Sequence, residues 1–124
     1  MALRMKLGLT GHTVDSITFD YRVAIAFGDG SVITIETAFK ITHADGRVVM
    51  IDPEAVEEPD AILVALHDEV EEAEYTEGGS LRLQMKRTTW TIEPDPEYES
   101  WSLGSPGTPS RVVSGPVGSL LVWS

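Results

Sequence analysis

The chain of 124 residues contains no cysteine and no asparagine, and it has few basic residues. Without cysteine it can form no disulfide, no thiolate zinc site and no cysteine nucleophile. Nine lysines and arginines stand against twenty acids, which gives a formal net charge of -11 at pH 7. Neutralising phosphates requires clustered basic side chains, so we expect no direct binding to nucleic acid.

Long hydrophobic runs are also missing. No stretch approaches the roughly 20 apolar residues that span a bilayer, and the N-terminal segment has no apolar run of signal-peptide length. Together with the lack of cysteine, this predicts a cytoplasmic protein without membrane contact. There is no Gly-x-Ser-x-Gly elbow, no Ser-x-x-Lys pair and no phosphate-binding glycine loop, so we assign no cofactor, no metal and no catalytic residue.

What the chain does have is alternating hydrophobic patterning. Residues 21–27 and 31–37 alternate apolar and polar side chains around Gly28-Asp29-Gly30, which predicts a β-hairpin. A second hairpin is expected over residues 39–51, around Asp45-Gly46. Further strands are expected at residues 14–19, 70–75, 81–85, 88–93, 98–103, 111–113 and 120–123. One short helix, from Pro59 to His67, begins with a proline suited to a first helical turn.

These elements predict one domain, residues 1–124, in the α+β class with mostly antiparallel sheet. We expect either a two-sheet sandwich or a partly open barrel, with the short helix packed against it. The alternating positions also predict the core, because successive side chains of a strand face opposite sides. The expected buried set is Tyr21, Val23, Ile25, Phe27, Ile33, Ile35, Leu83 and Trp90.

Two stretches of the chain share a pattern. Residues 12–51 and 68–103 each begin with a three-strand meander that ends in Ile-Glu, and the segment 52–67 joins them. A duplicated meander explains this similarity, and it predicts two related sheets or half-sheets. Independent strand patterning explains it equally well, because few residues are identical.

The acidic residues are concentrated in one block. Residues 52–77 contain eleven acids and no lysine or arginine, whereas acids and bases balance in the rest of the chain. Carboxylates packed so closely repel one another, which predicts raised pKa values and stability that rises as the pH falls toward about 5. The block is either an ordinary solvated surface or an electrostatic docking face for a basic protein partner.

For the docking interpretation, we select six candidate partner-binding residues. Tyr98 and Trp101 lie three positions apart, so in one strand they point to opposite faces, and we expect one of them to be an exposed anchor. The acidic candidates are pairs of neighbouring glutamates within the block. The full set is Glu57, Glu58, Glu71, Glu72, Tyr98 and Trp101.

Two alternative functions remain. Asp95, Glu97 and Glu99 alternate along the chain, and on one face of an extended segment they could bind a divalent cation or supply an acid and a base. This would make the protein a small enzyme or a cation-binding module. The other alternative is a structural or oligomeric protein without a ligand.

The C-terminal third resembles a known family. Pro94-Asp95, Tyr98-Glu99-x-Trp101 and Gly118-Ser-Leu-Leu-Val-Trp123 are similar to a pattern in small, mostly actinobacterial proteins of unknown function. The segment Phe27-Gly-Asp-Gly-Ser resembles the same family, although Lys86-Arg87-Thr88 replaces its usual Asp-Gly turn. This resemblance implies no activity. The small, acidic, β-rich build is similar to that of bacterial immunity proteins, which suggests a non-enzymatic, immunity-like binding protein.

Overall fold

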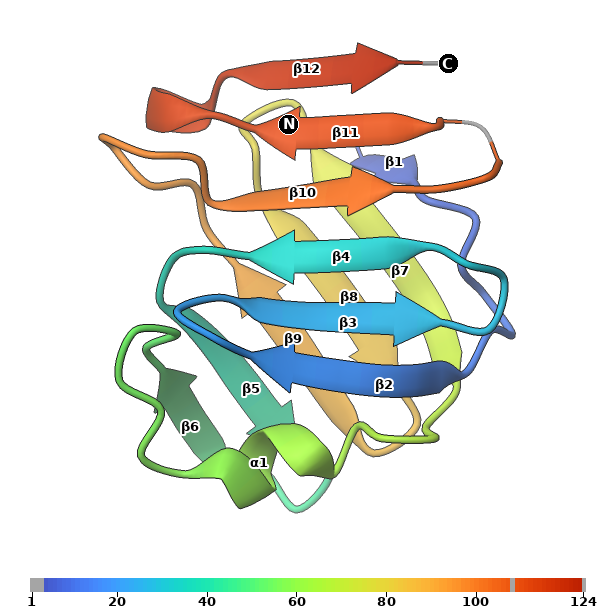
Figure 1. Cartoon of the computed structure of the whole chain (residues 1–124), viewed down its shortest axis with the longest axis vertical. Helices are drawn as coiled ribbons and strands as arrows, with labels where there is room; N and C mark the ends of the chain where they lie inside the picture. The colour runs from blue at the N-terminus through green and yellow to red at the C-terminus, as the bar shows by residue number, and fades with distance from the viewer. Residues whose placement is uncertain (1–3, 108, 124) are drawn as a thin grey trace.

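A computed structural model describes residues 4–107 and 109–123 and shows two antiparallel β-sheets packed face to face (Figure 1). Sheet I has the strand order β1-β7-β8-β9-β5-β6, and sheet II has the order β12-β11-β10-β4-β3-β2. Neither sheet closes on itself. The expected mostly antiparallel fold with one short helix is therefore confirmed, and its arrangement is that of a sandwich.

Most strand boundaries follow the alternating segments of the sequence, but β1 was not expected and the strand expected at 98–103 begins only at Trp101. Sheet I consists of β1 (Arg4–Lys6), β7 (Val70–Thr76), β8 (Leu81–Met85), β9 (Thr88–Ile92), β5 (Phe39–His43) and β6 (Val48–Ile51). Sheet II consists of β12 (Leu120–Trp123), β11 (Arg111–Ser114), β10 (Trp101–Gly104), β4 (Val32–Ile35), β3 (Val23–Phe27) and β2 (Val14–Phe19). A 3-10 turn, η1 (Pro116–Gly118), connects β11 to β12.

The core lies between the two sheets. Seven of the eight side chains expected there are buried, including Val23, Ile25 and Phe27 from β3. Trp90 and Trp101 are both completely buried, and Phe39 stacks on Trp90 with ring centroids 5.2 Å apart. Burying the large aromatic side chains contributes much of the apolar area that stabilises the fold.

Tyr21 is the exception, and its expected burial is wrong. Its side chain is 80% exposed, because the chain turns at this residue with a backbone φ of 64°. The alternation that places Val23 inside therefore does not extend back to Tyr21. A non-glycine residue is uncommon in this left-handed region, and the conformation costs about 1–2 kcal/mol.

The helix is shorter than expected. It runs as α1 (Pro59–Leu63), and turns follow it as far as His67, which has a φ of 65°. The His67 backbone NH donates to the Val14 carbonyl at 2.8 Å, so it pairs with the strand segment and not with the helix. In the part of the chain that the structure describes, no helix is both long and apolar enough to cross a membrane.

The two similar stretches of sequence follow the same path. The meander β2–β3–β4 belongs to sheet II, and the chain then crosses to form β5–β6 in sheet I. The meander β7–β8–β9 belongs to sheet I, and the chain then crosses to form β10–β11 in sheet II. The first strand after each crossing pairs with the last strand of the other meander: β5 pairs with β9, and β10 pairs with β4. A common origin of the two stretches stays a prediction.

Candidate functional site

The acidic block divides into two parts in space. Its C-terminal part forms β7, where cations from outside the block lie beside it. Glu74 approaches Arg4 at 3.8 Å and Glu72 approaches Lys6 at 3.6 Å, because β1 pairs with β7. Glu69 lies 3.4 Å from Lys86, which follows β8. The sequence separates these cations from the block, and the sheet brings them to it.

This pairing changes the expected electrostatics of β7. A hydrogen bond shared with the Glu74 side chain, followed by the nearby Lys6 ammonium, lowers the pKa of Glu72. The expectation of a raised pKa is therefore wrong for this carboxyl group. Glu71 lies on the same strand, and its carboxylate accepts a hydrogen bond from Gln84 at 3.4 Å.

The N-terminal part of the block is the loop 52–58 between β6 and α1. Its acids, Asp52, Glu54, Glu57 and Glu58, are all exposed. Within residues 4–107 and 109–123 none of them forms an ion pair, although Arg47 lines one hollow together with Glu57 and Glu58. Carboxylates on β7 are thus paired with cations, whereas those on this loop keep their negative charge unpaired among the described residues.

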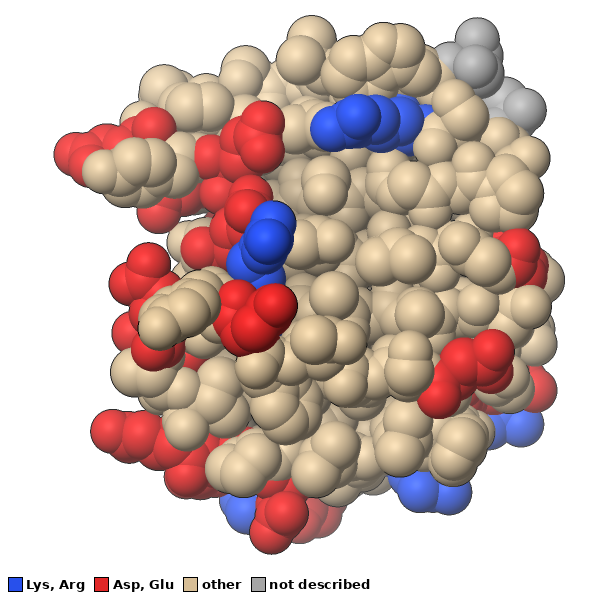
Figure 2. All heavy atoms as spheres, viewed as in Figure 1, with Lys and Arg blue, Asp and Glu red and all other residues tan. Residues whose placement is uncertain are grey.

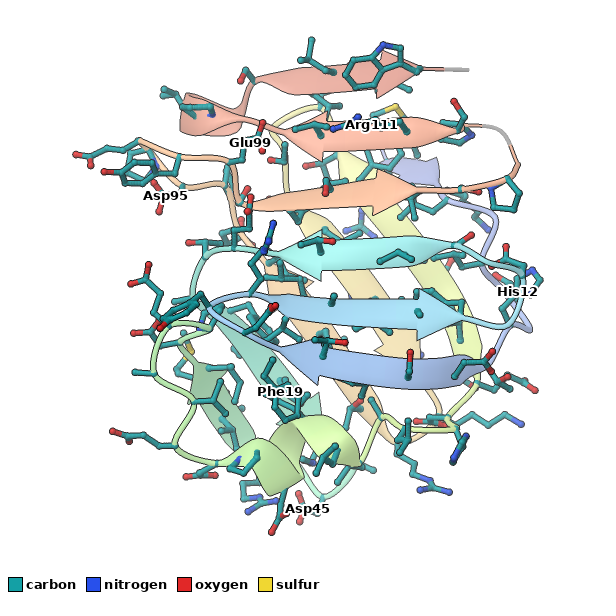
Figure 3. All side chains as sticks on the ribbon, in the orientation of Figure 1. His12, Phe19, Asp45, Asp95, Glu99 and Arg111 are labelled. Atoms are coloured by element: carbon teal, nitrogen blue, oxygen red, sulfur yellow. The ribbon has the colours of Figure 1, made fainter. Side chains whose placement is uncertain are left out.

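An aromatic hollow lies beside this loop. Its volume is about 490 Å³, and it is formed where the β2–β3 turn meets the loop and the start of α1. Phe19 lies at the end of β2, near α1 (Figure 3). The lining residues are Phe19, Asp20, Tyr21, Pro53, Glu54, Val56 and Pro59. A hollow of this composition offers ring faces and carboxylates to the same ligand.

The β9–β10 loop extends the acidic surface on the same side of the molecule. Its residues 94–99 reach outward from the sheets beside the β4–β5 connection (Figures 1 and 3). Thr37 of that connection donates a hydrogen bond to the Asp95 carboxylate at 3.3 Å. Arg22 of the β2–β3 turn lies 3.7 Å from Glu36. These contacts join the β2–β3 turn, the β4–β5 connection and the β9–β10 loop.

We call this surface the acidic margin and define it as residues 19–22, 36–38, 52–58 and 94–99. Figure 2 shows acidic side chains gathered along this side of the molecule, whereas the face over the centre of sheet II is largely uncharged. Arg22 is the single basic residue of the four segments. Two tyrosines are exposed on the margin, Tyr21 at 80% and Tyr98 at 69%.

The margin keeps some of the candidate residues and excludes others. Glu57, Glu58 and Tyr98 belong to it, but Glu71 and Glu72 lie on β7, apart from it. Trp101 is completely buried, and its indole NH donates to the Gly79 carbonyl at 2.8 Å. Trp101 is therefore a core residue, and Tyr98 is the exposed member of the pair.

The three alternating carboxylates do not share one face. Asp95 accepts hydrogen bonds from the backbone NH groups of Glu97, at 2.7 Å, and Tyr98, at 3.0 Å, which closes a turn. These two bonds lower the pKa of Asp95. The expectation of an extended segment is wrong, because Asp95 uses its carboxylate to shape the loop. No cluster of three potential metal ligands occurs in the described chain.

A comparison with protein families assigns the chain as a whole. One family model matches residues 5–124, which span all strands from β2 to β12. The chain belongs to this family of unknown function (DUF6188). The family resemblance in the sequence is thereby confirmed, without an activity attached to it. Comparisons with curated proteins and with solved structures found no match.

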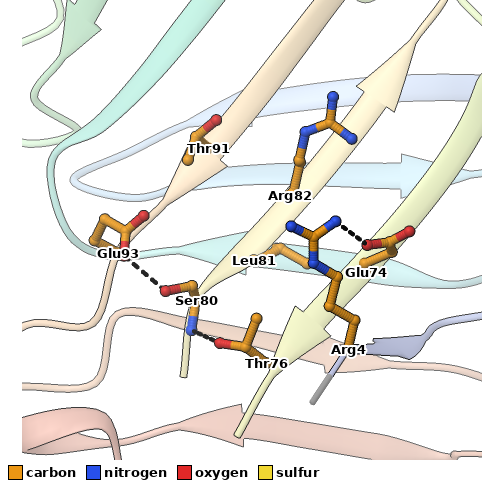
Figure 4. Close-up of a pocket in the computed structure, with 8 residues that line it drawn as sticks. All are labelled: Arg4, Glu74, Thr76, Ser80, Leu81, Arg82, Thr91 and Glu93. Atoms are coloured by element: carbon orange, nitrogen blue, oxygen red, sulfur yellow. Dashed lines mark hydrogen bonds and ion pairs between the residues drawn. The ribbon is translucent and has the colours of Figure 1, made fainter. Parts of the chain in front are cut away.

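Another hollow of this DUF6188 protein lies on the outer face of sheet I (Figure 4). It has a volume of about 250 Å³, and its lining includes two arginines and two glutamates. Arg4 pairs with Glu74, and the Ser80 hydroxyl donates to Glu93 at 2.6 Å. Its charges balance internally, so the hollow has no excess charge with which to attract a ligand.

A serine, an aspartate and a histidine also meet at the β3–β4 turn of the DUF6188 chain. The Ser31 hydroxyl donates to Asp29 at 2.8 Å, and His12 lies 3.7 Å from the same carboxylate. In a catalytic triad the imidazole stands between the hydroxyl and the carboxylate. Here the carboxylate stands in the middle, so this arrangement shapes the turn and does not activate Ser31.

Sequence patterns missed part of the margin. Asp20 and Tyr21 lie in a turn, and Glu36 follows a strand, so no spacing rule connects them with the 52–58 loop. The sequence offered one weak indication that this turn is exposed, because Tyr21 lies between the charged residues Asp20 and Arg22 at the end of a short strand. Residues of this kind in turns are exposed more often than residues within a strand.

Proposed function

We propose that the protein is a non-enzymatic binding protein that docks a basic protein partner through the acidic margin. The observation that carries this proposal is a pair of exposed tyrosines, Tyr21 and Tyr98, among carboxylates of the 52–58 loop that form no ion pair within the described residues. Lysine and arginine side chains fit such a surface, because they stack on aromatic rings and pair with carboxylates.

The conformation of Tyr21 supports the same function. Its left-handed backbone is unfavourable for a residue with a side chain, and the exposed ring makes no ring-to-ring contact within the described chain. Strained backbone of this kind is concentrated at functional sites, where the surrounding structure holds it. A tyrosine side chain has only two rotatable bonds to the ring, so it loses little entropy when a partner covers it.

The charge of the margin suggests the kind of partner and the way it arrives. A one-sided field accelerates association with a protein of opposite charge and makes that rate fall with ionic strength. A basic toxin whose functional surface is covered by the margin would satisfy this chemistry. Because the chain has no cysteine, it suits a reducing compartment, and we expect the encounter in the cytoplasm.

The test compares two charge-matched variants. In the margin variant, Glu54, Glu57 and Glu58 are changed to glutamine, and in the β7 variant Glu71, Glu72 and Glu74 are changed in the same way. Each is immobilised beside the wild type and exposed to lysate of the source organism. We expect a basic protein to be retained by the wild type and the β7 variant and lost by the margin variant.

The association rate of the captured protein provides the quantitative readout. It should fall about tenfold or more between low and physiological salt for the wild type, and Tyr21→Ala should increase the dissociation rate. Equal capture by both glutamine variants would show that the margin is not the docking surface. Capture of acidic proteins only would contradict the proposed partner chemistry.

A further inference from the structure

β12 is an edge strand of which only Leu120 packs against the core. Strands of a sandwich normally alternate buried and exposed side chains. In β12, Leu121, Val122 and Trp123 are exposed at 59%, 49% and 45%, and Leu120 is half-buried. Apolar side chains are thus exposed on both faces of this strand.

Two of the other three edge strands carry charges or a bulge, and a loop lies beside the third. β1 carries Arg4 and Lys6, and β2 carries Asp15 and a bulge between Val14 and Ser16. The loop 52–58 lies beside β6, where residues of both line one hollow. Charges, bulges and covering loops are the usual means by which proteins prevent edge-to-edge pairing. β12 has no charged residue, no proline and no bulge in its pairing with β11.

The open edge of β12 is held firmly in position. The turn before it packs tightly on the β7–β8 turn. Gly118 lies so close to the Gly78 carbonyl that a side chain at this position would have no room. The Gly115 backbone NH donates to the Ser119 carbonyl at 2.8 Å and closes this turn. Hydrogen bonds alternate along an antiparallel pair, so the register directs the peptide groups of Leu120 and Val122 to the open side. A pre-formed edge pays little ordering entropy when another strand pairs with it.

The charge distribution identifies the partner. Residues 100–124 contain no acid and a single base, Arg111, whose guanidinium lies 5.3 Å from the centre of the Trp123 ring. Figure 2 shows this blue side chain in an otherwise uncharged area around β10–β12, at the position labelled Arg111 in Figure 3. A basic partner finds no carboxylate here. A second copy, which elsewhere carries the same excess of acids, can approach closely only at a surface without acids.

We propose that β12 pairs antiparallel with β12 of a second copy, so that sheet II continues across a symmetric dimer. A two-fold axis at Val122 places this residue opposite its own copy, with the two peptide groups that face the open side paired with each other, and places Leu121 opposite Trp123. These cross-strand pairs are apolar, which is the kind of pair that stabilises neighbouring strands. This dimer leaves the acidic margin available to its partner.

The test is the mass of the protein in solution, measured by sedimentation equilibrium at increasing concentration. We expect wild-type dimers that strengthen with added salt, because salt screens the repulsion between two acidic chains. Val122→Lys should shift the protein to monomers, since the two-fold axis brings two ammonium groups together. The matched control is Val48→Lys on β6, a valine of similar exposure, 53%, on another edge strand. It should remain dimeric.

Three results would overturn the proposal. One is a wild-type monomer up to about 1 mM, the weak limit of specific association. A second is a dimer that Val48→Lys disrupts and Val122→Lys does not. The third uses thiols, because the chain has no cysteine. Under a short bismaleimide, Val122→Cys should form covalent dimers and Val48→Cys should not, so equal crosslinking of the two variants contradicts the interface even if Val122→Lys fails to fold.

Discussion

The two halves of the molecule, β2–β6 and β7–β11, have the same order of strands. They differ in the first turn of each meander, because the β7–β8 turn packs against other strands and the β2–β3 turn is exposed. In both, a bulge disturbs the register at the start of the meander, between Val14 and Ser16 in the first and between Val70 and Glu72 in the second. The segments that enter the two meanders also pair with each other through the Thr13–Glu69 bridge.

The hydrogen bonds around this bridge are reciprocal. The Val14 NH donates to Asp68, and the equivalent Val70 NH donates to His12, both at 2.9 Å. This is the ordinary pattern of an antiparallel bridge, in which equivalent bonds run in both directions.

The turns after the first strand of each meander have different surroundings. Three residues separate the last pair of β2 and β3, Phe19 and Val23, and five separate Tyr75 and Leu81 of β7 and β8. Gly79 of the longer turn is buried against the C-terminal strands, where its carbonyl accepts hydrogen bonds from Trp101 and Ser114. The shorter turn exposes Tyr21. The same architecture thus packs one turn against the sheet and leaves the other exposed.

Separating the two halves should have the largest effect on stability, because each half supplies a strand to the other half's meander. Because β5 pairs with β9 and β10 pairs with β4, each half alone leaves a meander without its neighbouring strand. Expressed separately, residues 1–58 and 59–124 should show no cooperative unfolding by circular dichroism, and mixing them should restore it. If either fragment melts cooperatively alone, the halves are more independent than this pairing implies.

The covered turn should tolerate substitution far less than the exposed one. Gly79 has a φ of 88°, and an added Cβ would lie 2.7 Å from the Ser114 hydroxyl and 3.1 Å from the Gly118 Cα. Gly79→Ala should therefore cost roughly 2–4 kcal/mol of unfolding free energy, measured by urea denaturation. Tyr21→Gly should change stability by less than about 1 kcal/mol, because relief of strain offsets the added chain entropy. Equal costs at the two turns would contradict the comparison.

The β3–β4 turn, after the second strand of the first meander, contains a carboxyl group with a lowered pKa. Burial alone would raise the pKa of Asp29, but the NH and hydroxyl of Ser31, together with His12, outweigh it and lower the pKa below 3.8. A lowered folded pKa stabilises the protein above the unfolded value, and this contribution is lost as the pH falls through the folded value. Asp29→Asn should cost about 1 kcal/mol at pH 7 and progressively less below pH 3.8, in melting temperatures recorded from pH 7 to pH 2. A constant cost across this range would show that the charge has no role.

The two parts of the acidic block should differ in sign, with the smallest effect. Glu57→Gln with Glu58→Gln removes unpaired charge and should slightly raise the melting temperature, whereas Glu72→Gln with Glu74→Gln removes paired charge and should slightly lower it. Differential scanning calorimetry at low salt measures both, and added salt should reduce both effects. The same sign for both pairs would contradict the division of the block into a neutralised strand and an unpaired loop.

Much of the architecture was predictable from local pattern. The hairpin around Asp29, the hairpin around Asp45 and the helix that begins at Pro59 all lie where alternation and turn residues placed them. The antiparallel closing pair of β11 and β12 was expected as well. β1 was not predicted, because three residues that include Arg4 and Lys6 have no alternating apolar pattern.

The sequence by itself determined the alternation, the turns and an excess of acid, since these depend on neighbours along the chain. Only the tertiary structure decided where each acid finds a cation. It brought Lys6 to Glu72 and Arg4 to Glu74 across a strand pair, and among the described residues it gave the acids of the 52–58 loop no ion pair. It also exposed Tyr21, which the alternating pattern had predicted to be buried, and it buried Trp101, for which that pattern gave no decision. Pairing between distant strands sets these outcomes, and the energy of such contacts is not encoded in any local window.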